Sequence, residues 1–597
     1  MSDSSKLNPR EIYQNRLAAR QTEAAECQRW HLLLGYVRLA LVIAGIAVAW
    51  CSFYQHSMSR WWLLAISVVF VVVVRRHSAV LQKKAEAQRA IAFFQRGIAR
   101  IEDRWTESPT RVVEVNTTGS LFAEDLDLFR RGGLFDLLNT ARTSAGDTVL
   151  ASWLLEPAER DVVLARQKAI AELRGMTELR EHLASCGDAD FESLDVEGLA
   201  QWAAGTEPKI PVFWRWVCPF LAALTVAAAI RYLATNHGLP LLVMALIDAT
   251  ITFALLKKTQ TLFVNAERAS ASLKLASVLI ARFEQPEFSS PLLSELQQPL
   301  RSKTGSASHA LARLALLAQM MEHRGNLIVR TLDAPLLYSV QLAGAAQAWR
   351  RRYGPSLARW LESLSHLEAL QSLATYSFEH PDDPFPELTA GTPCFEVAAL
   401  GHPLLPEAKC VRNDVSLGNE TSLLLVSGSN MSGKSTLLRA VGINAVLAMA
   451  GAPVRASSLR MTPLHVGASI QVNDSLQEGR SRFYSEILRL RAVCGLAEER
   501  PPVLFLLDEL LDGTNSSDRL TGAAGIAHAL MNAGAIGMIS THDLALTTIG
   551  EGAHTLRNVH FEERIENGEM HFDFRLRDGV VTTRNGVSLM RMVGLKV

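Results

Sequence analysis

Long uncharged apolar runs near the N-terminus dominate the hydrophobic pattern of this sequence. Residues 39–58 carry no formal charge, and about 20 such residues in a helix cross the roughly 30 Å hydrocarbon core of a bilayer. The run at 61–74 is shorter, but Arg60 on one side and Arg75 with Arg76 on the other can reach the interfaces. We therefore expect the two runs to form a membrane-spanning hairpin.

A second pair of apolar runs, at 210–230 and 238–256, predicts another hairpin. Both runs are long enough to cross a bilayer, and a short turn joins them. Arg215 and Asp248 interrupt the runs, and charged residues are costly in lipid, so we expect the two side chains to neutralise each other partly. The alternative for both hairpins is a set of buried core helices in a soluble protein, and the two charged residues strengthen it for the second.

Basic residues flank the four runs in a consistent way. If every run crosses the bilayer, the arginines and lysines before the first run, after the second and after the fourth all lie on the same side. Positive residues favour the cytoplasmic side, so we expect an integral inner-membrane protein with both termini and the C-terminal domain in the cytoplasm. These residues are Arg16, Arg20, Arg29, Arg75, Arg76, Lys83, Lys84, Lys257 and Lys258.

Outside these runs, the pattern changes near residue 390. Before it, apolar residues recur at helical spacing, and a linker rich in Pro and Asp ends this part. After it, short β-branched or Leu-rich runs alternate with helical stretches, as in a mostly parallel α/β sheet. The sequence thus predicts a multidomain protein: an N-terminal region with the first hairpin (1–105), a helical core or lever in two parts (106–205 and 259–388) around the second hairpin (206–258), and an α/β domain (389–597).

The first chemical motif of the α/β domain is a glycine-containing loop. Residues 428–435 read GSNMSGKS and satisfy G-x-x-x-x-G-K-[ST], after an apolar strand and before a helical stretch. In such a P-loop, backbone amides and the helix N-terminus face phosphate oxygens, the lysine reaches the β and γ phosphates, and the hydroxyl binds Mg²⁺. We therefore expect ATP or GTP here. The candidate nucleotide-binding residues are Gly428, Ser429, Asn430, Met431, Ser432, Gly433, Lys434, Ser435 and Thr436.

Two later strand ends carry side chains suited to phosphoryl transfer. Asp508 and Glu509 end the apolar run 503–507, and we expect Asp508 to help hold Mg²⁺ and Glu509 to orient or deprotonate the attacking water. His542 follows the next predicted strand and is suited to sensing the γ-phosphate. A solvated acidic turn and an ordinary loop histidine are the alternatives. The order of the three motifs along the chain favours the catalytic interpretation.

The charge balance limits the partners. Lys plus Arg and Asp plus Glu both number 60, so no overall basic field points to a nucleic acid. Any DNA binding must be local, and one candidate is the segment 349–353 (WRRRY), where arginines between aromatics can grip phosphate and stack on a base. A solvated helix face is the alternative. The 7 cysteines show neither metal-site nor disulfide spacing, which is typical of reduced cytosolic thiols.

These motifs resemble those of the MutS mismatch-repair family. The loop GSNMSGKST is similar to the family's GPNMGGKST, whose Asn-Met pair is unusual among phosphate-binding loops. The segment 476–483 (LQEGRSRF) resembles the family's LASGRSTF, and 508–516 (DELLDGTNS) resembles DEIGRGTST. Further similar segments are Gly401-His402-Pro403, the core-domain segment 133–157, and 585–595 near the C-terminus. The resemblance covers residues 112 to 200 and 360 to 597.

The resemblance implies an ABC-type ATPase that uses ATP with Mg²⁺ and works as a homodimer through its ATPase domains. Ser481 matches the family's signature serine and would contact the γ-phosphate bound by the partner subunit. On this basis Ser435 and Asp508 hold the metal, while Glu509, His542 and Ser481 are catalytic. Hydrolysis would be coupled to movement of the helical lever.

Departures from the family bear on DNA binding. Ser429 and Ser432 replace a Pro and a Gly of the family's loop, which leaves the amide cradle possible. We expect the mismatch-reading N-terminal domain to be lacking, because two spans occupy the region before the core. We therefore predict a membrane-anchored MutS-family ATPase that couples ATP to binding of mismatched, branched or damaged DNA. The alternative is an ATP-driven switch that acts on a membrane or protein partner without DNA, and a transporter is a third, weaker interpretation.

Overall fold

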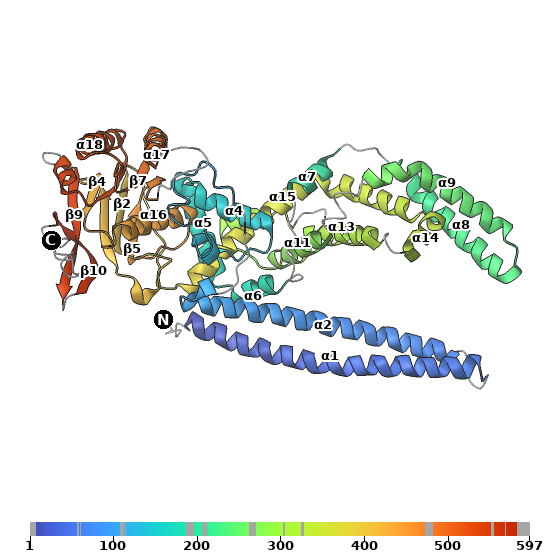
Figure 1. Ribbon diagram of the computed structural model, residues 1–597. Coiled ribbons are helices and arrows are strands. Elements are labelled where there is room, and N and C mark those ends of the chain that lie inside the picture. The colour runs from blue at the N-terminus through green and yellow to red at the C-terminus, as the bar shows by residue number, and fades with distance from the viewer. Residues whose placement is uncertain are drawn as a thin grey trace.

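The molecule is elongated, with an α/β part at one end and a helical part that extends from it as two long arms (Figure 1). The computed structural model describes residues 8–55, 59, 61–107, 113, 115–186, 196–205, 211, 213–261, 270–301, 305–323, 327–471, 482–550, 555–566 and 569–581. The helical elements come first along the chain, and among the described residues every strand lies after residue 386. This arrangement confirms the predicted order of a mostly helical region followed by an α/β domain.

The first arm is an antiparallel pair of long helices, α1 (Pro9–Phe53) and α2 (Trp61–Ile101). Asn8 caps α1 by accepting a hydrogen bond from the Arg10 amide, and Pro9 follows at the position where a missing N–H costs nothing. The two helices pack on each other along the arm, while their apolar outer windows are almost wholly exposed. By length and composition, both helices are apolar enough to cross a membrane.

The second arm contains α8 (Trp214–Thr235) and α9 (Leu239–Thr261). The helix α8 ends at Asn236, whose φ of 57° gives the left-handed conformation typical of a residue that stops a helix. By length and composition α8 can also cross a membrane, whereas the apolar part of α9, Leu239–Leu255, is shorter. The inner ends of both helices pack against α14 (Leu327–Leu336) and the start of α15 (Tyr338–Glu379).

The predicted pairing of Arg215 with Asp248 is wrong. Asp248 is buried and accepts a hydrogen bond from Thr225 Oγ1 at 2.6 Å, whereas Arg215 is exposed and lines a cavity that does not include Asp248. The antiparallel register places Asp248 level with Thr225, and ten helical residues separate Thr225 from Arg215, a distance of about 15 Å along the axis. Apolar composition alone does not predict this register, which gives the two charged residues different surroundings.

The helix α15 is the spine of the helical part. Its 42 residues correspond to a length of about 63 Å, and it runs from the second arm to the α/β part. Most of the remaining helices pack along it. They are α3 (Leu134–Leu138), α4 (Ser144–Leu155), α5 (Arg160–Arg174), α6 (Thr177–Ser185), α7 (Val196–Ala204), α11 (Ser270–Phe283), α12 (Pro291–Gln297) and α13 (Ala307–Glu322), with a short 3-10 turn at Trp105–Glu107.

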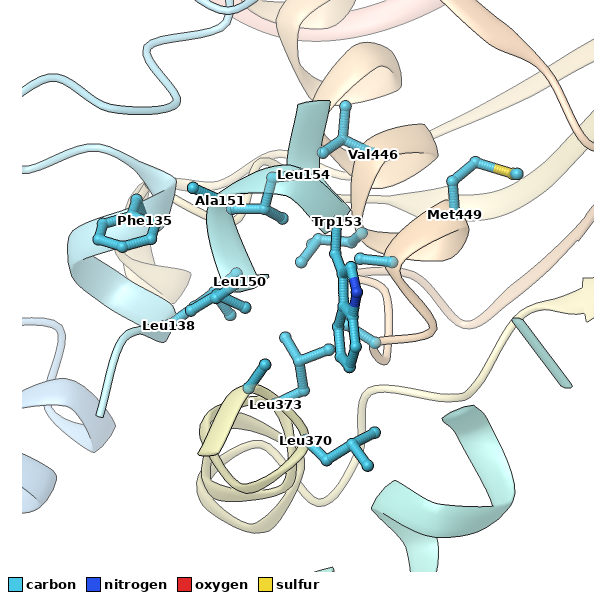
Figure 2. Packing of buried hydrophobic residues seen from close by; sticks show 14 of the residues in the cluster. Phe135, Leu138, Leu150, Ala151, Trp153, Leu154, Leu370, Leu373, Val446 and Met449 are labelled. Atoms are coloured by element: carbon cyan, nitrogen blue, oxygen red, sulfur yellow. The ribbon is translucent and has the colours of Figure 1, made fainter. Parts of the chain in front are cut away.

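A shared hydrophobic core joins the helical part to the α/β part. Figure 2 shows Trp153 and Leu154 of α4 between Leu370 and Leu373 of α15 and the side chains of α16 (Lys434–Ala450), among them Val446. All of these residues belong to one continuous cluster of buried side chains. Burial of large apolar side chains contributes about 1.5–3 kcal/mol each, so this junction resists separation. Because α15 and α16 share this core, we expect a movement of α16 to displace α15 as well.

The α/β part contains two sheets. The smaller has strand order β1-β5-β2-β3, and the larger has order β10-β9-β4-β8-β7-β6, in which all neighbours run parallel except β9 and β10. The central strands β4, β7 and β8 are buried along nearly their whole length, as their continuous apolar sequences require. The strands are β1 (Glu387–Leu388), β2 (Cys394–Leu400), β3 (Asn413–Gly418), β4 (Leu423–Ser427), β5 (Ser458–Met461), β6 (His465–Ser469), β7 (Val503–Asp508), β8 (Ile536–Thr541), β9 (Leu556–Glu566) and β10 (Glu569–Asp578). The other helices of this part are α17 (Arg482–Leu496) and α18 (Ser516–Asn532), with 3-10 turns at Glu407–Lys409 and Leu544–Gly550.

Candidate functional site

The candidate site lies where three adjacent parallel strands end. In the larger sheet β8 lies between β4 and β7, with Ser427 opposite Thr541 and Asp508 opposite Ser540. The segments that follow these strands therefore emerge side by side at one edge. Ligands of open parallel sheets bind outside the carboxyl ends of the strands, which is where this arrangement gathers the predicted residues.

The loop 428–433 connects β4 to α16 and forms a cup of backbone. Gly433 has a φ of 104°, a left-handed conformation that favours glycine, and a Cβ there would lie 3.1 Å from the Phe574 ring. The helix α16 begins at Lys434, so the unpaired amides of its first turn point toward the cup. Ser435 and Thr436 lie in that turn and line the same cavity as Asn430 and Met431.

The Lys434 side chain lies inside this cup. Its Nζ donates hydrogen bonds to the carbonyl oxygens of Gly428, at 2.9 Å, and Ser429, at 2.8 Å, and lies 3.8 Å from Glu509 Oε1. Burial lowers the pKa of Lys434, and the negative charges of Glu509 and Asp508 oppose that shift. The ammonium group thus occupies the centre of the cup, opposite the acidic strand end.

The acidic pair projects from the end of β7. Asp508 accepts a hydrogen bond from Ser540 Oγ on the neighbouring strand. Glu509 has a φ of 48°, and its amide donates to the Ser540 carbonyl at 3.2 Å. A left-handed backbone at a non-glycine residue is strained, and such strain clusters at functional sites. The turn directs Glu509 toward Lys434 rather than along the strand.

His542 completes a row of charged and polar groups across the strand ends. Its Nδ1 lies 3.4 Å from Glu509 Oε1, and its Nε2 lies 3.8 Å from Asp512 Oδ1. Glu509 therefore stands between Lys434 and His542 and is close to both. The structure thus brings together the three motifs that were predicted separately from the sequence.

The remaining predicted residues are placed as follows. Ser429 hydrogen-bonds through its hydroxyl to Glu563 of β9, and the buried Ser432 hydroxyl has no hydrogen-bond partner within the described part of the chain. Ser481 lies outside the described residues, as do the family-like segments near the C-terminus, 585–595. Its predicted role across a dimer stays a prediction.

Two adjoining cavities flank the loop, and the second was not predicted. One has a volume of about 330 Å³ and is lined by the loop, Asp508 and Glu509. The other, of about 180 Å³, has a mostly apolar lining that includes Leu405, Val411 and Phe561. Phe574, Gly433 and Thr436 line both cavities. A polar cup therefore opens directly beside an apolar cleft.

Phe574 lies between the two cavities because the strand β10 bulges there. The register with β9 shifts between Phe572 and Leu576, and Phe574 itself has a φ of 53°. Asn413 holds the bulge: its Nδ2 donates to the Phe574 carbonyl at 3.0 Å, and its Oδ1 accepts from the Leu576 amide at 2.7 Å. Bulges redirect side chains near functional sites. His402, from the family-like segment Gly401-His402-Pro403, also lines the apolar cavity.

The local DNA-binding candidate does not have the expected geometry. Trp349 and Tyr353 are buried in the packing around α15, and Trp349 Nε1 donates to the Ala310 carbonyl at 2.7 Å. Their rings are therefore not available to stack on a base. Arg350 is buried as well, and only Arg351 and Arg352 are exposed.

Comparisons with known proteins agree with the site's motifs. Residues 424–596 match the family model described as MutS domain V. The chain is 29% identical over 287 residues to the DNA mismatch repair protein MutS of Staphylococcus saprophyticus, which covers 46% of this chain and 32% of that protein. It is 31% identical over 252 residues to the protein of the same name from Shouchella clausii, covering 41% of this chain and 28% of that one. The chain thus spans about a third or less of the relatives' own length.

Proposed function

We propose that this chain, a MutS-family protein by its C-terminal half, is a membrane-anchored ATP hydrolase that works as a dimer. The observation that carries the proposal is the position of Glu509 beside both Lys434 and His542, at the mouth of a backbone cup. Phosphoryl transfer depends on positioning and on neutralising charge, and this site offers both at one strand edge.

The cup fits a triphosphate with its metal. The amides of the loop and of the first turn of α16 face the cavity, and anions bind at such helix N-termini. When a nucleotide binds, the Lys434 ammonium would give up its hydrogen bonds to the Gly428 and Ser429 carbonyl oxygens and donate to phosphate oxygens instead. The Ser435 hydroxyl and the Asp508 carboxylate are oxygen ligands of the kind that Mg²⁺ prefers, and bound Mg²⁺ would neutralise charge on the phosphates.

The apolar cleft beside the cup suits the base of the nucleotide. Its walls include Leu405, Val411 and Phe561, and Phe574 separates it from the phosphate cavity. A flat aromatic base gains free energy from contact with an aromatic ring and apolar side chains. We therefore assign the 180 Å³ cleft to adenine and the 330 Å³ cavity to the phosphates.

Glu509 would act as the base in hydrolysis. Its carboxylate orients a water molecule and takes its proton as the water oxygen bonds to the γ-phosphorus and the bond to the β,γ-bridging oxygen breaks. The proton then passes to the released phosphate. His542 beside Glu509 would sense the γ-phosphate, and Lys434 would stabilise the charge that develops during transfer. Ser481 of a second copy would complete the site.

The membrane anchor would be the outer parts of the two helical arms. The apolar windows of α1 and α2 and most of α8 are exposed, and lipid would remove that surface from water. The helix α15 joins the second arm to the α/β part, so closure of the nucleotide site would be transmitted toward the membrane. We place the α/β part on the cytoplasmic side of the inner membrane.

DNA is the second candidate ligand, and the names of the two relatives favour it. Both are called DNA mismatch repair proteins, but they match this chain over less than half its length. Against it, the formal net charge is zero and the aromatic rings of the segment 349–353 are buried. Affinity for mismatched or branched duplex that falls steeply with salt would establish this function, because phosphate contacts release counterions.

The proposal is tested with the detergent-solubilised full chain. ATP binding and turnover are measured for the natural protein, for Lys434→Ala and for Lys168→Ala, a control at an exposed lysine of α5 that lines neither cavity. We expect Lys434→Ala alone to lose ATP affinity. Membrane anchoring is tested separately by alkaline extraction of membranes, which should leave the chain in the pellet. Equal ATP affinity in all three proteins would refute the nucleotide site, and release by alkali would refute the anchor.

A further inference from the structure

A cavity of about 650 Å³ lies between α8, α13 and α15, far along the molecule from the nucleotide site. Four arginines from these three helices line it: Arg215 of α8, Arg313 of α13, and Arg351 and Arg352 of α15. No carboxylate is among the described residues that line the cavity. Arg215, Arg313 and Arg351 are exposed and form no ion pair in the described part of the chain.

Such a concentration of positive charge is unfavourable without an anion. Like charges that share a cavity repel each other, and guanidinium groups bind phosphate through paired hydrogen bonds. Because three helices contribute these arginines, the cluster is produced by the packing of the second arm on the spine and not by one basic stretch of sequence. The cavity therefore favours an anionic ligand, with a phosphate group as the best chemical match.

The rest of the cavity is apolar. Trp214, Leu316, Leu317 and Val340 form its walls, and Leu316 is 52% exposed. Gly344 also lines the cavity, and a Cβ built there would meet no atom within 4 Å. A ligand that fills this space must carry an apolar part beside its anionic group, since ligand pockets of this volume bury most of the bound molecule.

The position of the cavity indicates where such a ligand comes from. The first turns of α8, which form one wall, also carry the exposed aromatic side chains Phe213, Trp216 and Phe220. Aromatic side chains of this kind gather at membrane interfaces, and the exposed apolar surface of α8 continues beyond them. The cavity thus lies at the level where lipid headgroups would meet the second arm.

We propose that this cavity binds the headgroup of an anionic phospholipid. The lipid phosphate would lie among Arg215, Arg313 and Arg351. The acyl chains would extend out of the cavity beside Trp214 and lie along the apolar surface of α8. Nucleic acid is a poorer match, because Trp349 and Tyr353 on the cavity wall are packed into the helices and cannot stack on bases. The inference rests on the membrane anchoring of the second arm proposed above.

The test uses the full chain in neutral detergent and native mass spectrometry of bound lipid. Equal amounts of phosphatidylglycerol and phosphatidylcholine are offered to the natural protein, to the double variant Arg313→Gln/Arg351→Gln, and to a charge-preserving Arg313→Lys/Arg351→Lys variant. The matched control is Arg359→Gln, an exposed arginine of α15 outside the cavity. Thermal unfolding of each variant checks that it is folded.

We expect the natural protein, the lysine variant and the Arg359→Gln control to retain phosphatidylglycerol in preference to phosphatidylcholine. In the glutamine double variant, the ratio of retained phosphatidylglycerol to phosphatidylcholine should fall about tenfold, because charge-assisted contacts to phosphate are lost. Equal retention of the two lipids, or an unchanged preference in the glutamine variant, would overturn the proposal. Displacement of the lipid by inorganic phosphate at equal concentration would instead make this a site for free anions, and salt-sensitive displacement by duplex DNA would make it a nucleic-acid site.

Two further measurements separate this inference from the proposed function. ATP turnover is recorded on the same preparations, and membranes are extracted with alkali. Equal retention of the two lipids by the natural protein, with normal turnover and full membrane retention, would refute only the lipid site. Release of the chain by alkali would refute the membrane anchoring on which the lipid site rests.

Discussion

Arg100 of α2 and Glu379 of α15 form a buried bidentate pair, with Arg100 Nε and one terminal nitrogen each 2.6 Å from a Glu379 carboxylate oxygen. The Tyr13 hydroxyl of α1 donates to the same carboxylate at 3.2 Å. Glu379 is the last residue of the spine helix, so this cluster fixes the first arm at the junction with the α/β part. Burial, and then the adjacent Glu379 charge, raise the pKa of Tyr13, which keeps the phenol protonated.

Replacement of one member of this pair should loosen the first arm. Glu379→Gln leaves the Arg100 guanidinium buried without its counterion, and breaking a buried pair from one side costs about 3–5 kcal/mol. We expect faster proteolysis within α1 and α2 and a lower unfolding temperature. Limited proteolysis of the detergent-solubilised chain measures this, with Glu362→Gln on the exposed side of α15 as the control. Equal cleavage rates in both variants would show that the arm is held by other contacts.

The second arm should depend on Thr225 and not on Arg215. Thr225→Val removes the hydrogen bond that the buried Asp248 carboxylate accepts from Thr225, and an unsatisfied buried acceptor costs about 1–3 kcal/mol. Arg215→Gln changes an exposed side chain and should leave the stability of the arm within about 0.5 kcal/mol. Thermal unfolding in detergent compares the two variants. Greater destabilisation by Arg215→Gln would restore the Arg215–Asp248 pairing that the structure contradicts.

Glu368 should make stability depend on pH near neutrality. Burial raises the pKa of this α15 carboxyl from 4.5 to about 7, although the Thr143 hydroxyl and the Arg142 amide hydrogen-bond to it. The folded state therefore holds a proton that the unfolded state has released. This contribution to stability is complete below pH 4.5 and is lost as the pH rises to about 7.

Glu368→Gln, which cannot titrate, isolates this effect. The difference in unfolding temperature between the natural protein and the variant should shift in favour of the variant as the pH rises toward 7 and then level off. Because other groups such as His380 titrate equally in both proteins, their effects cancel in the difference. A difference that does not vary with pH would show that Glu368 has an ordinary pKa.

Phe574 should contribute to nucleotide affinity through the base. Phe574→Ala removes the ring between the two cavities, and loss of base–aromatic contact costs about 1–3 kcal/mol, or roughly tenfold in ATP affinity. Equilibrium binding of ATP checks this, with tripolyphosphate as a ligand that has no base. Its affinity should be unchanged. A parallel loss for both ligands would assign Phe574 to the phosphate cavity alone.

Much of the site could be predicted from local sequence. The loop 428–435 was recognisable because an apolar strand precedes it and a helix follows, and Asp508 with Glu509 stands directly after a buried strand. Their approach in space depends on strand order, with β8 between β4 and β7, which local sequence does not specify. The family resemblance supplied that missing information.

Other features depend on register and could not be predicted. Asp248 contacts Thr225 and not Arg215 because of the axial register of α9 against α8. Apolar composition alone does not determine this register. Phe574 reaches the cavity beside the loop 428–433 through a bulge that is held by Asn413, which is distant in sequence. The arginine cavity is built from three separate helices, so no single stretch of sequence revealed it.

The most direct measurement of the central claim is ATP turnover by the Glu509→Gln protein. Glutamine keeps the size of the side chain but cannot accept the proton of the attacking water, so we expect turnover to fall by about 10²–10⁴-fold while ATP still binds. Glu499→Gln, an exposed glutamate of the same part of the chain, should retain full turnover. Turnover by Glu509→Gln at the natural rate would contradict the assignment of Glu509, and with it the proposed hydrolytic site.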